Sequence, residues 1–150
     1  MEGKGGIGIK DRPSNKLGVV ACVDCHRGVA SKKKDTYEAI KKRCVECHDE
    51  SYGELVAQWK STSEELLKKV SLKMTQVKEK IDRIELRRGH TSVYHKLYGD
   101  AEFNYNLVIK GNGVHNEEYA EELLEYADTR LDEALKQLSN GEKELAAGKT

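Results

Sequence analysis

The sequence predicts an all-α protein, and three observations support this. Apolar residues recur every three or four positions over long stretches, which is the spacing of one face of a helix. No stretch alternates apolar and polar residues for long enough to indicate a strand. Glycine-containing breakers separate the helical stretches. For 150 residues we expect one domain, residues 1–150, built as a long antiparallel helical hairpin with two irregular cysteine-bearing loops at one end.

The first third of the chain is predicted to contain little regular structure. Residues 1–16 combine several glycines with Pro13, so we expect a flexible N-terminal arm, mobile or held by a partner. A short helix is predicted over about residues 35–44, because Thr36 suits its N-cap and Ala39 and Ile40 form a small apolar face.

A long amphipathic stretch follows from Tyr52 to Arg88, and Gly89 is a plausible end for it. It is predicted to form one long helix or two in tandem, because Ser61 and Glu64 have the spacing of a capping box that restarts a helix. Its apolar positions recur at three and four residues: Leu55, Val56, Trp59, Leu66, Leu67, Val70, Met74, Val77, Ile81 and Ile84.

Two further helices are predicted towards the C-terminus. One covers about residues 100–110 and stops at Gly111-Asn112-Gly113, which favours a turn. The last helix is expected from about Asn116 to Ser139, ending at Asn140-Gly141. We expect the two long apolar stripes, on residues 52–88 and 116–139, to pack against each other as the antiparallel hairpin.

The four cysteines lie in two pentapeptides, Cys22-Val23-Asp24-Cys25-His26 and Cys44-Val45-Glu46-Cys47-His48. The CxxCH pattern is typical of covalent c-type haem attachment. In that chemistry two thiols form thioethers with the haem edge, and the following His coordinates the iron. The sequence therefore predicts two haems c, on Cys22, Cys25 and His26 and on Cys44, Cys47 and His48.

Two alternatives use the same cysteines differently. Two CxxC pairs at this separation also match a zinc ribbon, and small secreted domains carry structural disulfides. Neither alternative explains why His follows each pair. The helical pattern before Cys44 also differs from the short strands of a zinc ribbon. We therefore favour haem and keep zinc as the main rival.

Two six-coordinate haems need two axial ligands beyond His26 and His48. His115 is favoured first, because it follows the turn at residues 111–113 and precedes a helix, where the backbone can aim an imidazole at an iron. His95 and His90 follow the long helix, and either is a candidate for the other iron, with a slight preference for His95. These three complete the predicted iron ligands.

Met74 is another possible axial donor. It lies on the apolar stripe of the long helix, so we expect it to fill the core instead.

Charge and hydropathy exclude some classes of partner. Lys plus Arg and Asp plus Glu both number 26, so no basic field predicts nucleic-acid binding. No apolar run approaches the roughly 20 residues that span a bilayer. The Gly-rich start, residues 1–10, lacks the charged and apolar regions of a secretory signal. We expect redox partner proteins, other cytochromes among them, and a homo-oligomer is compatible with the long helices.

Three parts of the sequence together resemble multihaem cytochromes c. They are the two CxxCH motifs, the stretch from Cys44 to Tyr52 that runs into a long helix, and Phe103-Asn104-Tyr105 followed by Gly113-Val114-His115-Asn116-Glu117-Glu118-Tyr119-Ala120. Over about residues 40–128 the pattern is similar to the C-terminal part of the pentahaem nitrite reductase and octahaem hydroxylamine oxidoreductase group. The resemblance implies that His115 matches a distal haem ligand. It also implies an exported protein, periplasmic or extracellular, that moves electrons.

The departures from that group bear on activity. Its enzymes use more haems and a catalytic haem with an open coordination site, whereas this chain has two ordinary CxxCH motifs and no CxxCK variant. We therefore expect an electron-transfer dihaem cytochrome with bis-His ligation, a short electron relay and no enzymatic activity. The alternatives are a small haem enzyme or a sensor of gases or nitrogen oxides with one open iron site, and a zinc-stabilised interaction module.

Overall fold

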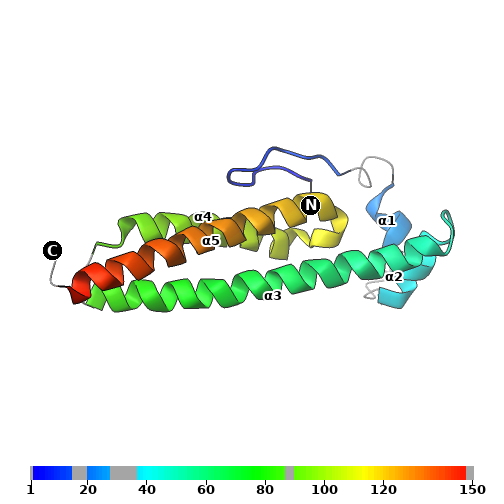
Figure 1. The fold of residues 1–150 in the computed structure, drawn as a ribbon. Helices are drawn as coiled ribbons and strands as arrows, with labels where there is room; N and C mark the ends of the chain where they lie inside the picture. Colours follow the sequence, from blue (N-terminus) through cyan, green and yellow to red (C-terminus); the bar gives the residue numbers. More distant parts are fainter. Residues whose placement is uncertain (1, 15–19, 28–36, 87–89, 148–150) are drawn as a thin grey trace.

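The computed structural model describes residues 2–14, 20–27, 37–86 and 90–147 (Figure 1). Within these ranges the regular structure is entirely helical, which confirms the all-α prediction. The elements are α1 (Cys22–Cys25), α2 (Tyr37–Cys44), α3 (Ser51–Leu86), α4 (Ser92–Gly111), a 3-10 turn (Gly113–His115) and α5 (Glu117–Ala146). No helix in the described ranges combines the length and apolarity needed to cross a bilayer.

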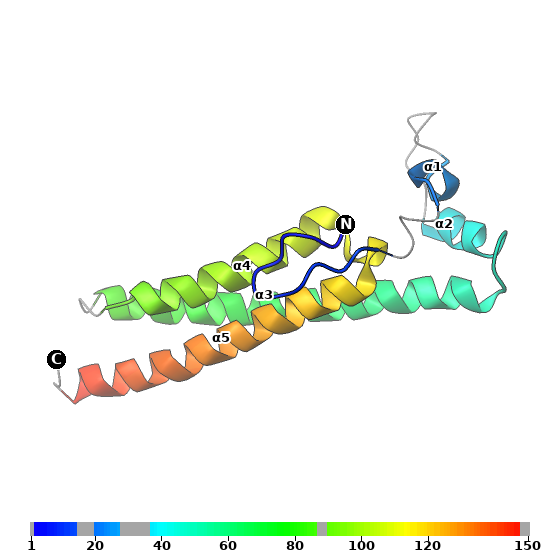
Figure 2. The same ribbon diagram turned by 90° about the horizontal axis from the view of Figure 1, so that it is seen from above.

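The three long helices α3, α4 and α5 lie side by side in an elongated bundle, and α1 and α2 sit at the end where α3 begins (Figures 1 and 2). Each long helix buries one apolar face, as the three-to-four spacing of its sequence requires. The buried side chains form one core: Val70, Val77, Ile81, Ile84, Leu97, Ala101, Val108, Tyr119, Ala120, Leu123, Leu124, Ala127, Leu131, Ala134 and Leu138.

α3 is a single helix of 36 residues, so the restart allowed by Ser61 and Glu64 is not used. The Ser61 hydroxyl instead donates to Glu65 within the continuous helix, at 3.3 Å. At about 1.5 Å per residue, α3 is roughly 54 Å long. The predicted cap of α2 at Thr36 and the predicted end of α3 at Gly89 lie outside the described residues.

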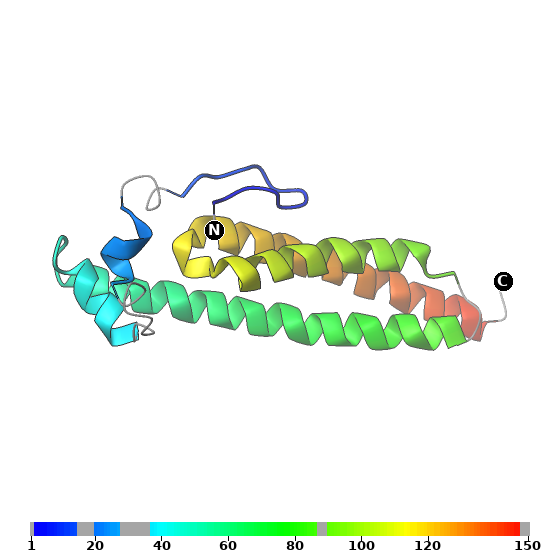
Figure 3. The ribbon, with the colours of Figure 1, turned by 180° about the vertical axis from the view of Figure 1, so that it is seen from behind.

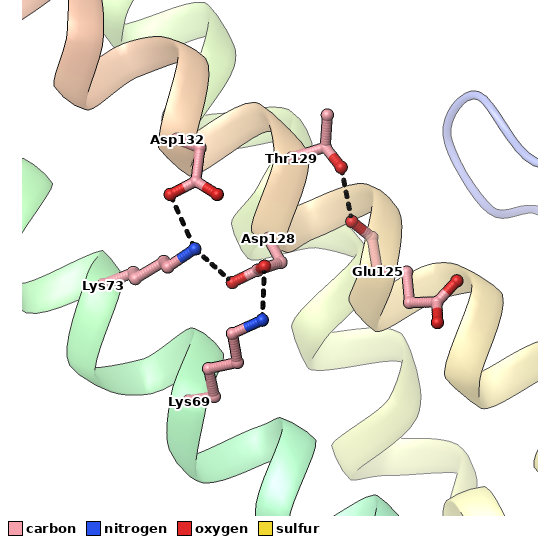
Figure 4. A network of polar contacts seen from close by, with 6 residues as sticks. All are labelled: Lys69, Lys73, Glu125, Asp128, Thr129 and Asp132. Carbon is pink, nitrogen blue, oxygen red and sulfur yellow. Dashed lines mark hydrogen bonds and ion pairs between the residues drawn. The ribbon is translucent and has the colours of Figure 1, made fainter.

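The expected antiparallel hairpin of the two long stripes is wrong, because α3 and α5 run parallel. The register is visible in their ion pairs, since Lys69 and Lys73 of α3 contact Asp128 and Lys80 contacts Glu142 further along both helices. Lys73 also reaches Asp132, at 2.6 Å (Figure 4). α4 runs in the opposite direction beside α5 and covers only part of the length of α3 (Figure 3).

Two helix boundaries differ from the sequence prediction. α4 begins at Ser92, ahead of the expected residue 100, because Leu97 of its first half is buried in the core. α5 continues through Asn140-Gly141 to Ala146. Gly141 serves close packing here, because a Cβ on it would lie 2.9 Å from the Tyr94 hydroxyl.

Residues 2–14, the described part of the N-terminal arm, pack against the helices of the bundle. The arm lies along α4 and α5, where Figure 2 shows it crossing both helices. Gly6 N–H donates to the Tyr119 hydroxyl at 2.8 Å, and Arg12 pairs with Glu118 and with Glu122 of α5. The arm is therefore held by this chain's own helices and needs no partner to order it.

Candidate cofactor site

The first CxxCH motif forms one helical turn. In α1 the Asp24 carboxylate accepts the Ala21 N–H at 2.7 Å, which satisfies a donor at the start of the turn. The His26 N–H donates to the Cys22 carbonyl at 2.8 Å. Cys22 and Cys25 are three residues apart on this turn, so they lie on a similar side of it. Cys22 is exposed and Cys25 is half-buried.

The second motif repeats this geometry at the end of α2. The His48 N–H donates to the Cys44 carbonyl at 2.9 Å, which matches the bond between His26 and Cys22. Cys44 is half-buried and Cys47 is exposed. The His48 ring stacks on Tyr52, with ring centres 3.9 Å apart and planes inclined by 10°. Both motifs therefore share one backbone hydrogen bond, from the His N–H to the carbonyl of the first Cys, whereas the exposed Cys is the first in one motif and the second in the other.

Two arginines tie the motifs to each other. Arg27, next to His26, forms an ion pair with Glu46, which lies between the two cysteines of the second motif; Nη2 is 2.5 Å from Oε2. The Arg43 guanidinium donates to the Cys25 carbonyl. These contacts hold α1 beside α2 at one end of the molecule (Figure 1).

His115 faces the first motif. Its ring centre is 5.9 Å from that of His26, and the two ring planes are inclined by 63°. The 3-10 turn positions it after Asn112, which adopts a positive φ of 54° that Asn tolerates better than most residues. His115 Nδ1 lies 3.2 Å from the Gly111 carbonyl, so Nδ1 donates there and Nε2 is the nitrogen that can coordinate.

This spacing is compatible with one metal ion held by both imidazoles. Because a metal–imidazole bond is about 2 Å long, two imidazoles that hold one ion would have ring centres no more than about 6 Å apart. The surroundings also suit an apolar macrocycle, because Val23 and Val45, inside the two motifs, are 57% and 37% exposed. The residues at the first motif therefore fit a bis-His haem.

The structure places His95 and His90 away from both motifs, and their assignment to the second iron stays a prediction. α3 separates them, since His48 precedes its first turn and His95 contacts Glu85 in its last turn. His95 Nε2 is 2.6 Å from Glu85 Oε1, and the Thr91 hydroxyl donates to the same oxygen. The hydrogen bond with His95, which has the larger effect, and the one from Thr91 both lower the pKa of Glu85. His90 is exposed at the same distant end.

Met74 packs against the hydrophobic core, as its place on the apolar stripe predicted. It is partly buried and lies at the middle of α3. Its position on α3 lies several turns from both cysteine motifs, so it is a core residue here.

The rival uses of the cysteines receive no support from this arrangement. No disulfide joins Cys22, Cys25, Cys44 and Cys47 in this structure. Among the described residues, no three His, Cys, Asp or Glu side chains gather closely enough to hold a metal ion by themselves. A zinc ribbon needs four such ligands around one point, whereas haem attachment needs the thiols at the edge of a macrocycle.

Several residues that shape the site were missed by the sequence analysis. Arg27, Arg43 and Glu46 link the motifs, while Ser14 and Asn116 join the N-terminal arm to the chain directly after the His115 side chain. The one available signal was the position of Glu46 between two cysteines and of Arg27 beside a ligand. Contacts to backbone carbonyls, such as those of Ser14 and Asn116, leave no periodic pattern in a sequence.

Comparison of this chain with protein-family models, with curated proteins and with solved structures finds no match. The functional argument therefore depends on the chain's own residues.

Proposed function

We propose that this chain is an electron-transfer dihaem cytochrome of the c type, related to the multihaem cytochromes. Cys22 and Cys25 would hold the first haem and Cys44 and Cys47 the second. His26 and His115 would be the axial ligands of the first iron, and His48 would be one ligand of the second. In this proposal the protein is not an enzyme.

The observation that carries the proposal is the separation of His26 and His115. The two residues are 89 positions apart in the sequence, yet their ring centres are 5.9 Å apart. Ordinary core packing does not call for this contact, because both side chains are half-buried at the end of the bundle. A shared iron between them explains both the spacing and the orientation of His115 Nδ1 towards Gly111.

Bound haem would supply an iron that cycles between ferric and ferrous states. The chain would tune this iron through its own groups. The Gly111 carbonyl accepts from His115 Nδ1 and so makes the other nitrogen a stronger ligand. The Arg27–Glu46 pair and the Arg43–Cys25 contact hold the two attachment motifs side by side, which favours a short relay between two cofactors.

The partners follow from the exposure of the second motif. Cys47, His48 and Tyr52 are all exposed, so a cofactor attached there would present an edge to another redox protein, such as a second cytochrome. Small transient interfaces suit such exchange. Because c-type haem attachment belongs to exported proteins of the group that this sequence resembles, a periplasmic or extracellular location is part of the proposal.

A second candidate function is favoured by one observation. His90 and His95 lie at the far end of α3, so with His115 placed beside His26 no other His in the described ranges reaches His48. The second iron would then keep one position for an exchangeable ligand such as carbon monoxide or nitric oxide. In that case the protein would be a ligand sensor or a small haem enzyme.

The test is the haem content and visible spectrum of protein produced with c-type maturation. Two haems should remain attached after denaturation, and the mass should rise by two haems. Replacing Cys22 and Cys25 by Ala should remove one haem, and replacing Cys44 and Cys47 should remove the other. A chain that matures without covalent haem would overturn the proposal.

The same spectra separate the two candidate functions. Two low-spin haems that do not bind carbon monoxide support the electron carrier. One low-spin and one high-spin haem, the second binding carbon monoxide in its ferrous state, support the sensor or enzyme. The attachment variants then assign the high-spin signal, which should disappear with Cys44 and Cys47.

A further inference from the structure

We propose that the N-terminal arm, residues 3–14, is a strap that positions His115 as an axial ligand, with Asn104, Asn116 and Tyr119 as the positioning residues. This inference rests on the proposed function, because it assigns a role in holding the first iron's second ligand. None of these side chains would touch the cofactor. They would act through the arm and the backbone beside His115.

Two buried polar side chains of the bundle, Asn104 and Tyr119, form hydrogen bonds with the backbone of the arm. Asn104 is fully buried on α4, and its amide makes both hydrogen bonds of a backbone pair with Ile7: Oδ1 accepts from N at 2.8 Å and Nδ2 donates to O at 2.9 Å. The Tyr119 hydroxyl is also buried and accepts from Gly6 N at 2.8 Å. These hydrogen bonds satisfy polar groups that are buried when the arm is docked, where an unpaired group is costly.

The sequence of the arm allows this close approach. A Cβ on Gly6 would lie 2.3 Å from Leu123 Cδ2 and 2.7 Å from the Tyr119 hydroxyl, so glycine is required at this point. Arg12 then fastens the other end of the arm to α5 through Glu118 and Glu122. The docking is therefore specific in sequence and not a chance contact of a loose terminus.

The end of the arm reaches the residue that carries the proposed ligand. The Ser14 hydroxyl donates to the His115 carbonyl at 2.7 Å, and the side chain of the next residue, Asn116, donates to the Arg12 carbonyl at 2.7 Å. Asn116 is buried. The strap therefore contacts the His115 carbonyl and the side chain of Asn116, both directly C-terminal to the His115 side chain. The sequence continues from the strap to the first CxxCH motif, where His26 faces His115.

The experiment measures how often His115 leaves the first iron. In the ferrous holoprotein, carbon monoxide can bind that haem only when His115 dissociates, so the rate of this slow binding phase reports the dissociated fraction. Asn104→Ala removes the clamp on Ile7 without touching His115, and Asn106→Ala, at an exposed position of the same helix, is its control. Tyr119→Phe keeps the buried ring and loses the hydroxyl, so it tests the strap if Asn104→Ala does not fold.

We expect Asn104→Ala to speed the slow phase by about 5- to 30-fold, as loss of a buried hydrogen-bonded pair predicts. Tyr119→Phe should speed it by a smaller factor, and Asn106→Ala should leave it at the wild-type rate. His115→Ala is the reference in which the slow phase becomes fast. A second haem that binds carbon monoxide would add a fast phase common to all the proteins.

Failure of the strap and failure of the proposed ligation look different. If His115→Ala abolishes the slow phase while Asn104→Ala and Tyr119→Phe keep the wild-type rate, the strap is overturned and the ligation stands. If His115→Ala leaves every phase unchanged, His115 is not an iron ligand, and both proposals are overturned.

Discussion

Arg27 and Glu46 join the two CxxCH motifs through a paired guanidinium and carboxylate, with Nη1 3.3 Å from Oε1 and Nη2 2.5 Å from Oε2. Each residue is adjacent to a predicted haem-attachment residue, Arg27 to His26 and Glu46 to Cys47. Both side chains are about half exposed, so the pair contributes little to stability. Its charges nevertheless lie where they would act on both irons.

The first prediction follows from those charges. Glu46→Gln removes a negative charge beside the motifs, which favours the reduced state, and should raise the reduction potentials by on the order of 20 mV. Arg27→Gln should lower them by a similar amount. Spectroelectrochemical titration measures both shifts, and high salt should reduce them. Shifts of the same sign in the two variants would contradict this electrostatic role.

The second prediction concerns the two classes of histidine. His115→Ala should convert one haem from low-spin to high-spin, because it removes the ring that faces His26. His95→Ala should leave the visible spectrum unchanged, because His95 pairs with Glu85 at the other end of α3. The ferric absorption spectrum provides the measurement. A spectral change in His95→Ala larger than that in His115→Ala would reverse the assignment.

The third prediction concerns the close approach beneath the 3-10 turn. A Cβ on Gly113 would lie 2.9 Å from Ser63 Oγ and 3.1 Å from the Ala120 Cβ. Gly113→Ala should therefore lower the free energy of unfolding by about 1–3 kcal/mol through overcrowding. Thermal or denaturant unfolding measures this change.

Ser63 provides the control for that variant. Its hydroxyl is buried, and no hydrogen-bond partner for it lies in the described part of the chain. Ser63→Ala should therefore be nearly neutral by itself and should recover part of the loss in Gly113→Ala. Strict additivity of the two substitutions would mean that the crowding does not involve Ser63.

The fourth prediction concerns pH and the ion pairs between α3 and α5. Burial alone would raise the pKa of Asp128, but hydrogen bonds from Lys69 and Lys73 outweigh it and hold the pKa below its ordinary value (Figure 4). The folded state thus has the lower pKa. The stabilisation by the carboxylate is present above about pH 4, the unfolded value, and is lost as the pH falls through the lowered folded pKa.

Asp128→Asn should therefore cost about 1–2 kcal/mol at neutral pH and should flatten the fall in stability below about pH 4. Thermal unfolding at several pH values measures both effects. Glu125→Gln is the control, because Figure 4 shows its carboxylate pointing away from Lys69 and Lys73. If Asp128→Asn keeps the acid sensitivity of the wild type, another carboxylate is responsible.

The sequence predicted features that depend on neighbouring residues, such as the positions of helices. The apolar spacing predicted α3 and α5, because burial of one face of a helix leaves a periodic signature. It failed on their direction, because the first half of α4 was not recognised. A helix that starts at Ser92 reverses the chain before α5 begins, so α5 runs parallel to α3.

The candidate site also combines residues that local patterns indicate with distances that depend on the tertiary fold. The spacing of Cys22, Cys25, Cys44 and Cys47 made them candidates for cofactor attachment, and the turn before His115 made it a candidate ligand. The path of α3 could not be read from the sequence, so the distance from His95 to His48 was not foreseen. The docking of the arm was hidden for a different reason, because its contacts use backbone groups that every residue possesses.

The parallel course of α3 and α5 also constrains how the chain folds. Neighbouring helices in sequence can pair early because the loop between them is short, whereas α3 and α5 meet only after α4 has reversed the chain. The Lys69–Asp128 and Lys73–Asp132 contacts join residues 59 positions apart. We therefore expect α4 and α5 to pair first during folding and α3 to dock late. Since both α3 and α4 pack against α5, shortening α5 should unfold the whole bundle.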